Sequence, residues 1–334
     1  MLEINHLSKT FNPGTVNQKT AIRDISLKLN NGDFVTVIGG NGAGKSTLLN
    51  LIAGSYLADR GQIIINQTAI ENLSEHQRAR YIGRVFQDPM MGTCADMTIE
   101  ENLAMALRRG KHRNLCWGIS AKEKAFFKEQ LKTLDLGLEE RLTTKVGLLS
   151  GGQRQAITLL MATMMQKISL NETVEANILF ALHKGRTPFY HRHLSHKDKQ
   201  QLPWDSELEV ILKKKVAEIT PLQQEKLQTI LNNLTKPSLL LLDEHTAALD
   251  PKTAKKVLDL TNQIIGTHHL TAIMITHNMK DALTYGNRLW MMDNGNLVLD
   301  IKEEQKTGLE VKDLLALFES QLDQNSLSDR MLLS

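Results

Sequence analysis

Residues 34–54 read FVTVIGGNGAGKSTLLNLIAG, and this stretch decides the fold. Its first five residues, FVTVI, are typical of a buried strand, and its end, STLLNLIAG, is typical of a helix. Between them, residues 39–46 match the pattern G-x-x-x-x-G-K-[ST] at every fixed position. A buried strand, a glycine-rich turn and a helix in this order predict a phosphate-binding loop in an α/β protein.

The loop supplies the first candidate site residues. Its glycines allow backbone N–H groups to turn toward phosphate oxygens, and the dipole of the following helix favours an anion. In this pattern Lys45 reaches the β- and γ-phosphates, and the Ser46 hydroxyl binds Mg²⁺. The other candidate ligands in the loop are Gly39, Asn41, Gly42, Gly44 and Thr47. A glycine-rich turn that binds nothing is the alternative, and the context on both sides argues against it.

A second stretch, SLLLLDEHTAALD at residues 238–250, supplies two carboxylates. Its leucines predict a buried strand that delivers Asp243 and Glu244 to its carboxyl end, where ligands of α/β sheets bind. Asp243 is the candidate to hold Mg²⁺, directly or through water. Glu244 is the candidate to orient the attacking water, because phosphoryl transfer depends mainly on positioning and electrostatics. Taken alone, the stretch also fits a charged strand end without a function.

The rest of the chain alternates between strand-like and helix-like segments. Residues 2–11 and 21–29 alternate apolar and polar side chains, which predicts an antiparallel pair. Residues 98–110 and 121–136 have helical spacing. Strand-like segments then return, separated by helical ones, and this order indicates a parallel sheet covered by helices.

The composition is that of an ordinary globular protein, with 334 residues, 41% of them hydrophobic and 23% charged. The net charge of +3, from 40 basic and 37 acidic residues, argues against a nucleic-acid partner. No apolar stretch approaches the roughly 18 residues of a membrane span, and the N-terminus does not resemble a signal peptide. The two cysteines, Cys94 and Cys116, imply no disulfide framework, and we expect a cytosolic location.

Residues 148–162, LLSGGQRQAITLLMA, resemble the signature motif of the ATP-binding-cassette (ABC) ATPases. The core of that motif, LSGGQ, matches Leu149 and the four residues Ser150, Gly151, Gly152 and Gln153. Further residues match the family's other marks in the family's order: an aromatic residue for adenine (Phe11), the Q-loop glutamine (Gln87), the D-loop aspartate (Asp250) and the switch histidine (His277). The resemblance covers about residues 1–165 and 236–302.

The resemblance implies an α/β fold, with a RecA-like P-loop NTPase core, an antiparallel β flap and an α-helical subdomain that carries the signature. The implied parts of the chain are the core (1–98 and 236–302), the helical subdomain (99–165), an inserted helical segment (166–235), and a C-terminal helix and tail (303–334).

The resemblance also implies ATP hydrolysis, with ATP and Mg²⁺ as cofactors. Mg²⁺ would be held by Ser46, Gln87 and Asp243, and catalysis would involve Glu244, His277 and Gln87. Because residues 150–152 open a helix, the signature is a second phosphate-binding N-terminus, which in this family completes the site of the opposite subunit. The implied partners are therefore a second nucleotide-binding subunit, as a homodimer, and membrane permease subunits. An importer would add an extracytoplasmic solute-binding protein, and the chain would lie on the inner face of the cell membrane.

Residues 166–235 depart from the family, in which the signature helix returns almost directly to the strand before Asp243. Within them, residues 173–199 match residues 98–124 at nine of 27 positions, with a constant shift of 75. Beyond that window the match fades. The nearest counterpart of the signature, TPLQQEKLQ at 220–228, lacks the serine and both glycines, so the insertion cannot supply a second signature.

Three smaller features have ordinary interpretations. His245 stands where proline is commoner, and we expect a loop variant without a catalytic role. His191, His193 and His196 have spacing that can bind a transition metal, but a solvated polar loop is favoured because no acidic or cysteine ligand stands beside them. The basic run Arg108, Arg109, Lys111 and Arg113 is interpreted as a solvated helix end.

Three functional classes are compatible with these motifs. The favoured class is the energising subunit of a transporter with separate membrane chains, and the motifs lean toward import of small solutes, amino acids among them. The second class is an exporter or lipid-releasing machine. The third is a soluble ABC ATPase acting on ribosomes or DNA, which would usually carry two cassettes or a long coiled coil. A copy that binds ATP without cycling is a further alternative.

Overall fold

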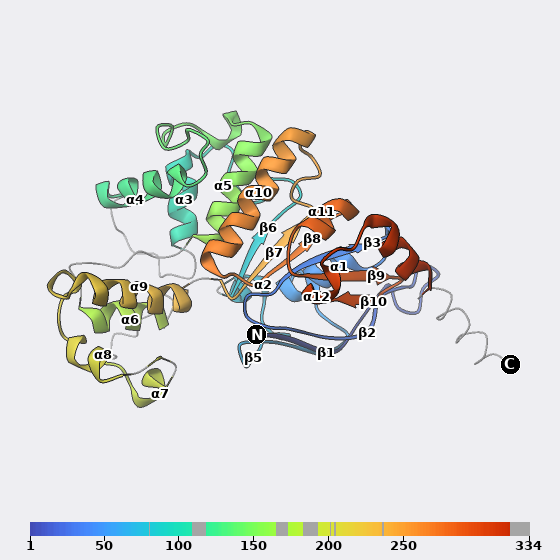
Figure 1. Cartoon of the computed structure of the whole chain (residues 1–334), viewed down its shortest axis with the longest axis horizontal. Coiled ribbons are helices and arrows are strands. Elements are labelled where there is room, and N and C mark those ends of the chain that lie inside the picture. Colours follow the sequence, from blue (N-terminus) through green and yellow to red (C-terminus); the bar gives the residue numbers. More distant parts are fainter. Residues whose placement is uncertain are drawn as a thin grey trace. The chain divides into compact units, whose positions relative to one another are not determined.

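The computed structural model describes residues 1–79, 81–108, 118–164, 173–182, 193–200, 202–203, 205–235 and 237–320. The chain divides into two compact units (Figure 1). The first unit comprises Met1–Cys94, Leu149–Leu159 and Ser238–Ser334, and the second comprises Ala95–Leu148 and Leu160–Pro237. Within the described part of the chain, no helix is both long and apolar enough to span a bilayer.

The first unit contains a four-stranded antiparallel sheet of order β2-β1-β4-β5. Its strands are β1 (Leu2–Phe11), β2 (Lys19–Leu29), β4 (Arg60–Ile65) and β5 (Thr68–Ala69). The antiparallel pairing predicted from the alternating pattern is confirmed, because β1 and β2 pair along their length with Leu2 opposite Leu29. The inward-facing side chains of this sheet join the main core of the unit, together with those of the second sheet.

The second sheet has six strands in the order β10-β9-β3-β8-β7-β6. They are β3 (Phe34–Gly39), β6 (Ile82–Val85), β7 (Leu239–Asp243), β8 (Ala272–Ile275), β9 (Arg288–Asp293) and β10 (Asn296–Ile301). All neighbouring pairs are parallel except β9–β10. The predicted α/β architecture, a parallel sheet with an antiparallel flap, is thus confirmed.

Helices connect the strands of the first unit. They are α1 (Lys45–Ala53), α2 (Glu75–Arg78), α5 (Gly151–Thr163, the first nine residues in this unit), α10 (Pro251–His268), α11 (Met279–Thr284) and α12 (Glu303–Lys306), and residues 311–320 are helical as well. Helix α1 is buried along one face by Leu48, Leu49 and Ile52, which pack in the core shared by both sheets. This packing fixes the start of α1 against the end of β3.

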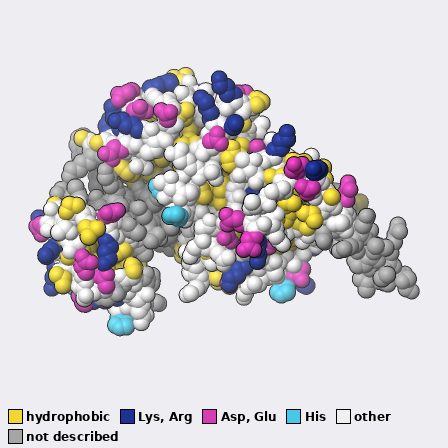
Figure 2. Space-filling model, in the orientation of Figure 1, with side chains coloured by type: hydrophobic (Ala, Val, Ile, Leu, Met, Phe, Trp, Pro, Cys, Tyr) yellow, Lys and Arg dark blue, Asp and Glu magenta, His cyan; other side chains and the backbone are white. Residues whose placement is uncertain are grey.

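The second unit is helical. Its elements are α3 (Ile99–Leu107), α4 (Ala121–Lys132), the 3-10 turn η1 (Val146–Leu148), α6 (Val174–Leu182), α7 (His196–Lys199), α8 (Ser206–Ile211), the 3-10 turn η2 (Val216–Glu218) and α9 (Pro221–Thr235). On the face shown in Figure 2, basic and acidic side chains are interspersed on both units.

The repeat found in the sequence is also a structural repeat, and it extends past the window of sequence similarity. Thr98 forms an isolated antiparallel bridge with Lys145, and Thr173 forms the equivalent bridge with Lys215. In each copy a 3-10 turn follows the bridge and a longer helix follows the turn, α5 from residue 151 and α9 from residue 221, a shift of 70. Among the described residues, the second segment therefore repeats the order of bridge, 3-10 turn and long helix that is found between residue 98 and the end of α5.

Local hydrogen bonds repeat as well. Ser120 and Glu123 cap α4 reciprocally, and Ser195 and Asp198 do the same for α7. The side-chain Nδ2 of Asn102 donates to the Thr98 carbonyl at 2.9 Å, and the Nδ2 of Asn177 donates to the Thr173 carbonyl at 3.0 Å. The second copy also has a core of its own, in which every buried residue lies between Val174 and Leu231.

Because the second copy has its own core, we predict that deleting residues 167–235 leaves the rest of the chain folded. Circular dichroism should show cooperative unfolding with a Tm within about 4 °C of the parent, equivalent to roughly 1 kcal/mol. Deletion of residues 98–163 is the matched control, since it removes the buried α5 residues Ala156, Ile157 and Leu159 and should prevent folding. The prediction fails if the two deletions are equally unfolded.

Candidate functional site

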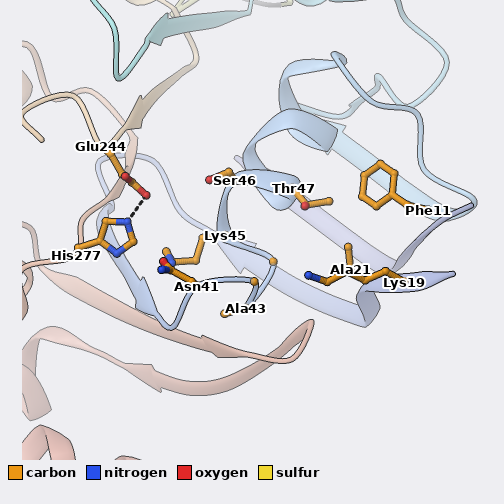
Figure 3. Close-up of a pocket in the computed structure, with 12 residues that line it drawn as sticks. Phe11, Lys19, Ala21, Asn41, Ala43, Lys45, Ser46, Thr47, Glu244 and His277 are labelled. Atoms are coloured by element: carbon orange, nitrogen blue, oxygen red, sulfur yellow. Dashed lines mark ion pairs between the residues drawn. The ribbon is translucent and has the colours of Figure 1, made fainter. Parts of the chain in front are cut away.

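A pocket of ≈ 290 Å³ opens beside the turn that joins β3 to α1 (Figure 3). Its lining residues are Phe11, Lys19, Ala21, Asn41, Gly42, Ala43, Gly44, Lys45, Ser46, Thr47, Glu244 and His277. In Figure 3, Glu244 and His277 lie at one end of the pocket, Phe11 and Lys19 lie at the other, and the turn runs between them. Nine of the sequence-predicted site residues therefore line one pocket, in segments far apart along the chain.

The glycine-rich turn adopts the conformation that its sequence favours. Gly44 precedes α1 with φ 102°, in the left-handed region, where a residue with a side chain would be strained. A Cβ at this position would also lie 2.5 Å from the carbonyl oxygen of Ala21, which is too close for any atom. Glycine is therefore required here both for the turn and for the close approach of β2.

Lys45 is buried, with 5% of its surface exposed. Its Nζ donates to the carbonyl oxygens of Gly39 at 2.9 Å and Gly40 at 3.0 Å. Burial lowers the pKa of Lys45, and the nearby carboxylates of Glu244 and Asp243 oppose that shift. An ammonium group held by two carbonyls beside two carboxylates is poised to bind an anion such as a phosphate.

Asp243 ends β7 next to the start of α1. Burial raises the pKa of its carboxyl group, and the Arg84 guanidinium, with Nη2 3.8 Å from Oδ2, opposes that shift. The Ser46 hydroxyl hydrogen-bonds to the same carboxyl group. Arg84 is itself held by Asn50 on α1, whose side-chain oxygen lies 2.6 Å from Nη2. Asp243 is therefore fixed between α1 and β6.

The pair formed by Ser46 and Asp243 suits Mg²⁺. A hydroxyl and a carboxylate are hard oxygen donors, and they are already in contact with each other. Mg²⁺ usually takes only one or two protein ligands and completes its shell with water and substrate phosphates. Among the described residues, no group of three or more His, Cys, Asp or Glu side chains could hold a metal, so a cage built from such side chains is not the arrangement here.

Glu244 and His277 contact each other at one end of the pocket. The Nε2 atom of His277 lies 2.6 Å from Oε1 of Glu244, as the dashed line in Figure 3 marks. The two residues follow adjacent strands, β7 and β8, in which Asp243 is in register with Ile275. Glu244 has φ 47°, a left-handed conformation that costs roughly 1–2 kcal/mol for a non-glycine residue. Strain of this kind is concentrated at functional sites.

Phe11 is the last residue of β1, and it lies at the end of the pocket away from Glu244 and His277 (Figure 3). Its ring makes an edge contact with Tyr56, with ring centroids 5.3 Å apart and planes at 78°. Across the sheet, Phe11 pairs in register with Lys19. An aromatic ring at this end of a phosphate pocket could stack on a nucleotide base.

Lys19 also lines the pocket, and no local motif of the sequence indicates it. It begins β2, and its Nζ would lie 3.3 Å from a Cβ placed on Gly42. Among the described residues, no carboxylate pairs with it. The only sequence signal was its place opposite Phe11, which depends on the register of two strands and is not written in a local motif. Ala21, in the same strand, was missed for the same reason.

The signature residues do not line the pocket. Ser150 and Gln153 cap the start of α5 reciprocally, with backbone nitrogens and side-chain oxygens 3.2 and 3.3 Å apart. A Cβ on Gly152 would lie 2.2 Å from Cγ2 of Thr253 in α10, so α5 and α10 approach closely here. Asp250, the N-cap of α10, accepts a hydrogen bond from the backbone of Thr253 at 3.1 Å.

Two further candidates lie outside the lining. Gln87 is exposed just after β6, and the carbonyl of Gly39 accepts a hydrogen bond from the pocket residue Lys45.

His245 lies in the turn after β7, where the sequence predicts a loop variant, and its side chain is buried. Only 2% of it is exposed, and Nε2 lies 3.1 Å from the hydroxyl oxygen of Thr261 in α10. Burial lowers the pKa of His245 to about 4, so the ring is neutral at physiological pH. The residue after Glu244 is thus anchored inside the unit.

His193 and Arg108 are both exposed, in agreement with the solvated positions expected for them. His193 lies 3.3 Å from the Glu175 carboxylate, so an acidic group does stand beside this histidine. Arg108, at the exposed end of α3, also pairs with Glu123 at 2.9 Å. His191, Arg109, Lys111, Arg113 and Cys116 lie outside the described residues.

Known proteins resemble this chain in sequence and in fold. A family model described as ABC transporter matches residues 22–170. The tyrosine transport ATP-binding protein of Clostridioides difficile is 36% identical over 319 residues, covering 96% of this chain and 99% of that protein. The sulfate/thiosulfate import ATP-binding protein CysA of Nitrosomonas europaea is 27% identical over 296 residues, which cover 89% of this chain and 59% of that protein.

Solved structures share the fold. The dimeric ATP-binding cassette MJ0796 bound to ADP and Pi has a TM-score of 0.59 at 22% identity, covering 91% of this chain and 99% of that one. The ADP conformation of the cassette MJ1267 has a TM-score of 0.61 at 21% identity, with coverage of 95% and 98%.

Because Lys19 projects over the turn without a carboxylate partner among the described residues, we predict that Lys19→Ala weakens ATP and ADP binding by about 5-fold, roughly 1 kcal/mol. Both nucleotides should be affected alike if the ammonium contacts a phosphate that they share. Fluorescence titration with a labelled ADP and competition by ATP would measure this, with Lys19→Arg restoring most of the affinity. Lys28→Ala, on the same strand but paired with Glu3, is the control. Equal affinities for Lys19→Ala and the parent would contradict the prediction.

Proposed function

Given that the chain belongs to the ABC transporter family of ATP-binding proteins, we propose that it is the ATP-hydrolysing subunit of a small-solute importer. The observation that carries this proposal is the pocket that collects Lys45, Ser46, Glu244 and His277. A cation for phosphate, an oxygen donor for Mg²⁺ and a carboxylate–histidine pair are the parts that ATP hydrolysis needs.

We propose the following roles within the pocket. The backbone N–H groups of the turn and the Lys45 ammonium hold the β- and γ-phosphates, and Phe11 stacks on the adenine. Ser46 and Asp243 hold Mg²⁺, with Gln87 as the further ligand that the family resemblance supplies. When bound, Mg²⁺ neutralises charge on the phosphate oxygens.

Glu244 orients the attacking water and accepts its proton. His277 holds the Glu244 carboxylate in place and contacts the γ-phosphate. The 2.6 Å contact between the Glu244 and His277 side chains supports these two roles, because each side chain fixes the orientation of the other. Positioning of this kind is the main protein contribution to phosphoryl transfer.

The signature residues complete the proposed site in the opposite subunit. Ser150, Gly151, Gly152 and Gln153 begin a helix but do not line the pocket of their own chain, which fits an arrangement in which two copies enclose two ATP molecules. Asp250, at the start of α10 next to Gly152, would lie at the same boundary. We propose a homodimer on this basis.

The proposed partners follow from the relatives. Tyrosine, sulfate and methionine transport or import are named for proteins similar to this chain. We infer a separate membrane permease, contacted through the Q-loop region from Gln87 to Met91, and an extracytoplasmic solute-binding protein. The chain would sit peripherally on the inner face of the cell membrane. The 36% identity to a tyrosine transport protein favours amino acids as cargo.

We predict that Glu244→Gln keeps ATP binding but reduces turnover by about 10² or more, the scale of other lost transition-state contacts. The amide keeps the size of the side chain but cannot take the proton of the attacking water. Steady-state phosphate release and nucleotide binding should be measured together. Glu304→Gln, an exposed carboxylate on α12, is the control and should match the parent. Unchanged turnover in Glu244→Gln would refute the assignment.

The transport proposal is tested by affinity purification of the tagged chain from gently solubilised native membranes. We expect a polytopic permease in the eluate, and a solute-binding lipoprotein beside it for an importer. A permease without such a lipoprotein would favour an exporter. Recovery of soluble partners alone would contradict the transporter assignment and favour a soluble ABC ATPase.

A further inference from the structure

His245 is a buried polar ring, and its hydrogen-bond partner shows how it is held. It is 2% exposed and lies directly after Glu244. A buried polar group without a hydrogen bond destabilises a fold, so the partner of this ring matters. That partner is the hydroxyl of Thr261, a residue 1% exposed in the middle of α10, at 3.1 Å from Nε2.

The direction of this hydrogen bond follows from the second bond of the hydroxyl. Thr261 donates its only hydroxyl proton to the carbonyl oxygen of Val257, at 2.7 Å, within the same helix. The oxygen can then only accept from His245, so Nε2 carries the ring proton. The ring is therefore a donor in one tautomer, and the loop after β7 is tied to α10.

The hydrogen bond between His245 and Thr261 lies next to Glu244, the residue with the strained backbone. Glu244 has φ 47°, and such a conformation persists only where neighbouring contacts hold it. On one side its backbone nitrogen donates to the carbonyl of Ile275 in β8, at 3.2 Å. On the other side the next residue, His245, is anchored to α10. The backbone of Glu244 is thus held between β8 and α10.

We propose that His245 is a positioning residue for ATP hydrolysis: through Thr261 it fixes the backbone from which Glu244 presents its carboxylate to the attacking water. The proposal rests on the role of Glu244 given above. It assigns no direct contact between His245 and the nucleotide, since the ring is buried against α10 and does not line the pocket.

The test uses two matched pairs of variants. His245→Leu removes the ring donor, whereas His245→Gln keeps an N–H group at nearly the same reach. Thr261→Val removes the hydroxyl, whereas Thr261→Ser keeps it. For each variant we would measure kcat, KM for Mg-ATP and Tm, with turnover expressed per folded protein.

We expect His245→Leu and Thr261→Val to lower kcat by about 10-fold while KM changes by less than about 2-fold, because only the reacting geometry is loosened. His245→Gln and Thr261→Ser should stay within about 3-fold of the parent. The double variant His245→Leu/Thr261→Val should be no slower than the slower single variant, since both remove one shared bond.

Other outcomes separate this proposal from the one on which it rests. If Glu244→Gln abolishes turnover but His245→Leu and Thr261→Val only lower Tm, the bond serves core packing and the positioning role is overturned. If Glu244→Gln leaves turnover intact, the role of Glu244 itself fails. Should His245→Leu not fold, the comparison of Thr261→Val with Thr261→Ser decides, because only the serine variant keeps a hydroxyl that can accept from His245.

Discussion

The parallel pairing of β3, β8 and β7 is the constraint on which the candidate site depends. Parallel strands end at the same edge of their sheet, so the residues that follow them must meet there. Val37 and Asp243 are both in register with Ile275, from opposite sides of β8. The phosphate turn, the Glu244 carboxylate and the His277 ring are brought to one place by this register. The buried Lys45 then supplies the positive charge among them.

This constraint also explains how much of the site could be read from the sequence. Each strand carries its own local signal, in the glycine-rich turn or in the leucines before Asp243, and such signals do not depend on the rest of the fold. Lys19 has no such signal, because its place follows from the pairing of β2 with β1. The hydrogen bond of buried His245 depends on Thr261 in α10, sixteen residues further along the chain. Residues positioned by distant elements are therefore the ones that a local pattern misses.

The repeat shows the same distinction between local pattern and fold. Its sequence similarity fades after residue 124, yet the bridge, the turn and the long helix continue in both copies. Capping tolerates substitution, since a hydroxyl and an amide or carboxylate side chain suffice. At the start of α9 Thr220 and Gln223 make the bonds that Ser150 and Gln153 make at α5. The two copies thus keep the same helix caps although the capping residues differ in type.

Close helix packing permits much less drift, and this separates the two copies. The first copy has Gly152 where α5 meets Thr253, and a side chain at that position would collide with the threonine. The second copy has Leu222 at the equivalent position, and 74% of that leucine is exposed. A leucine in the place of Gly152 would prevent the same approach to α10. The second copy therefore has the same order of elements as the first, but its long helix could not pack against α10 as α5 does.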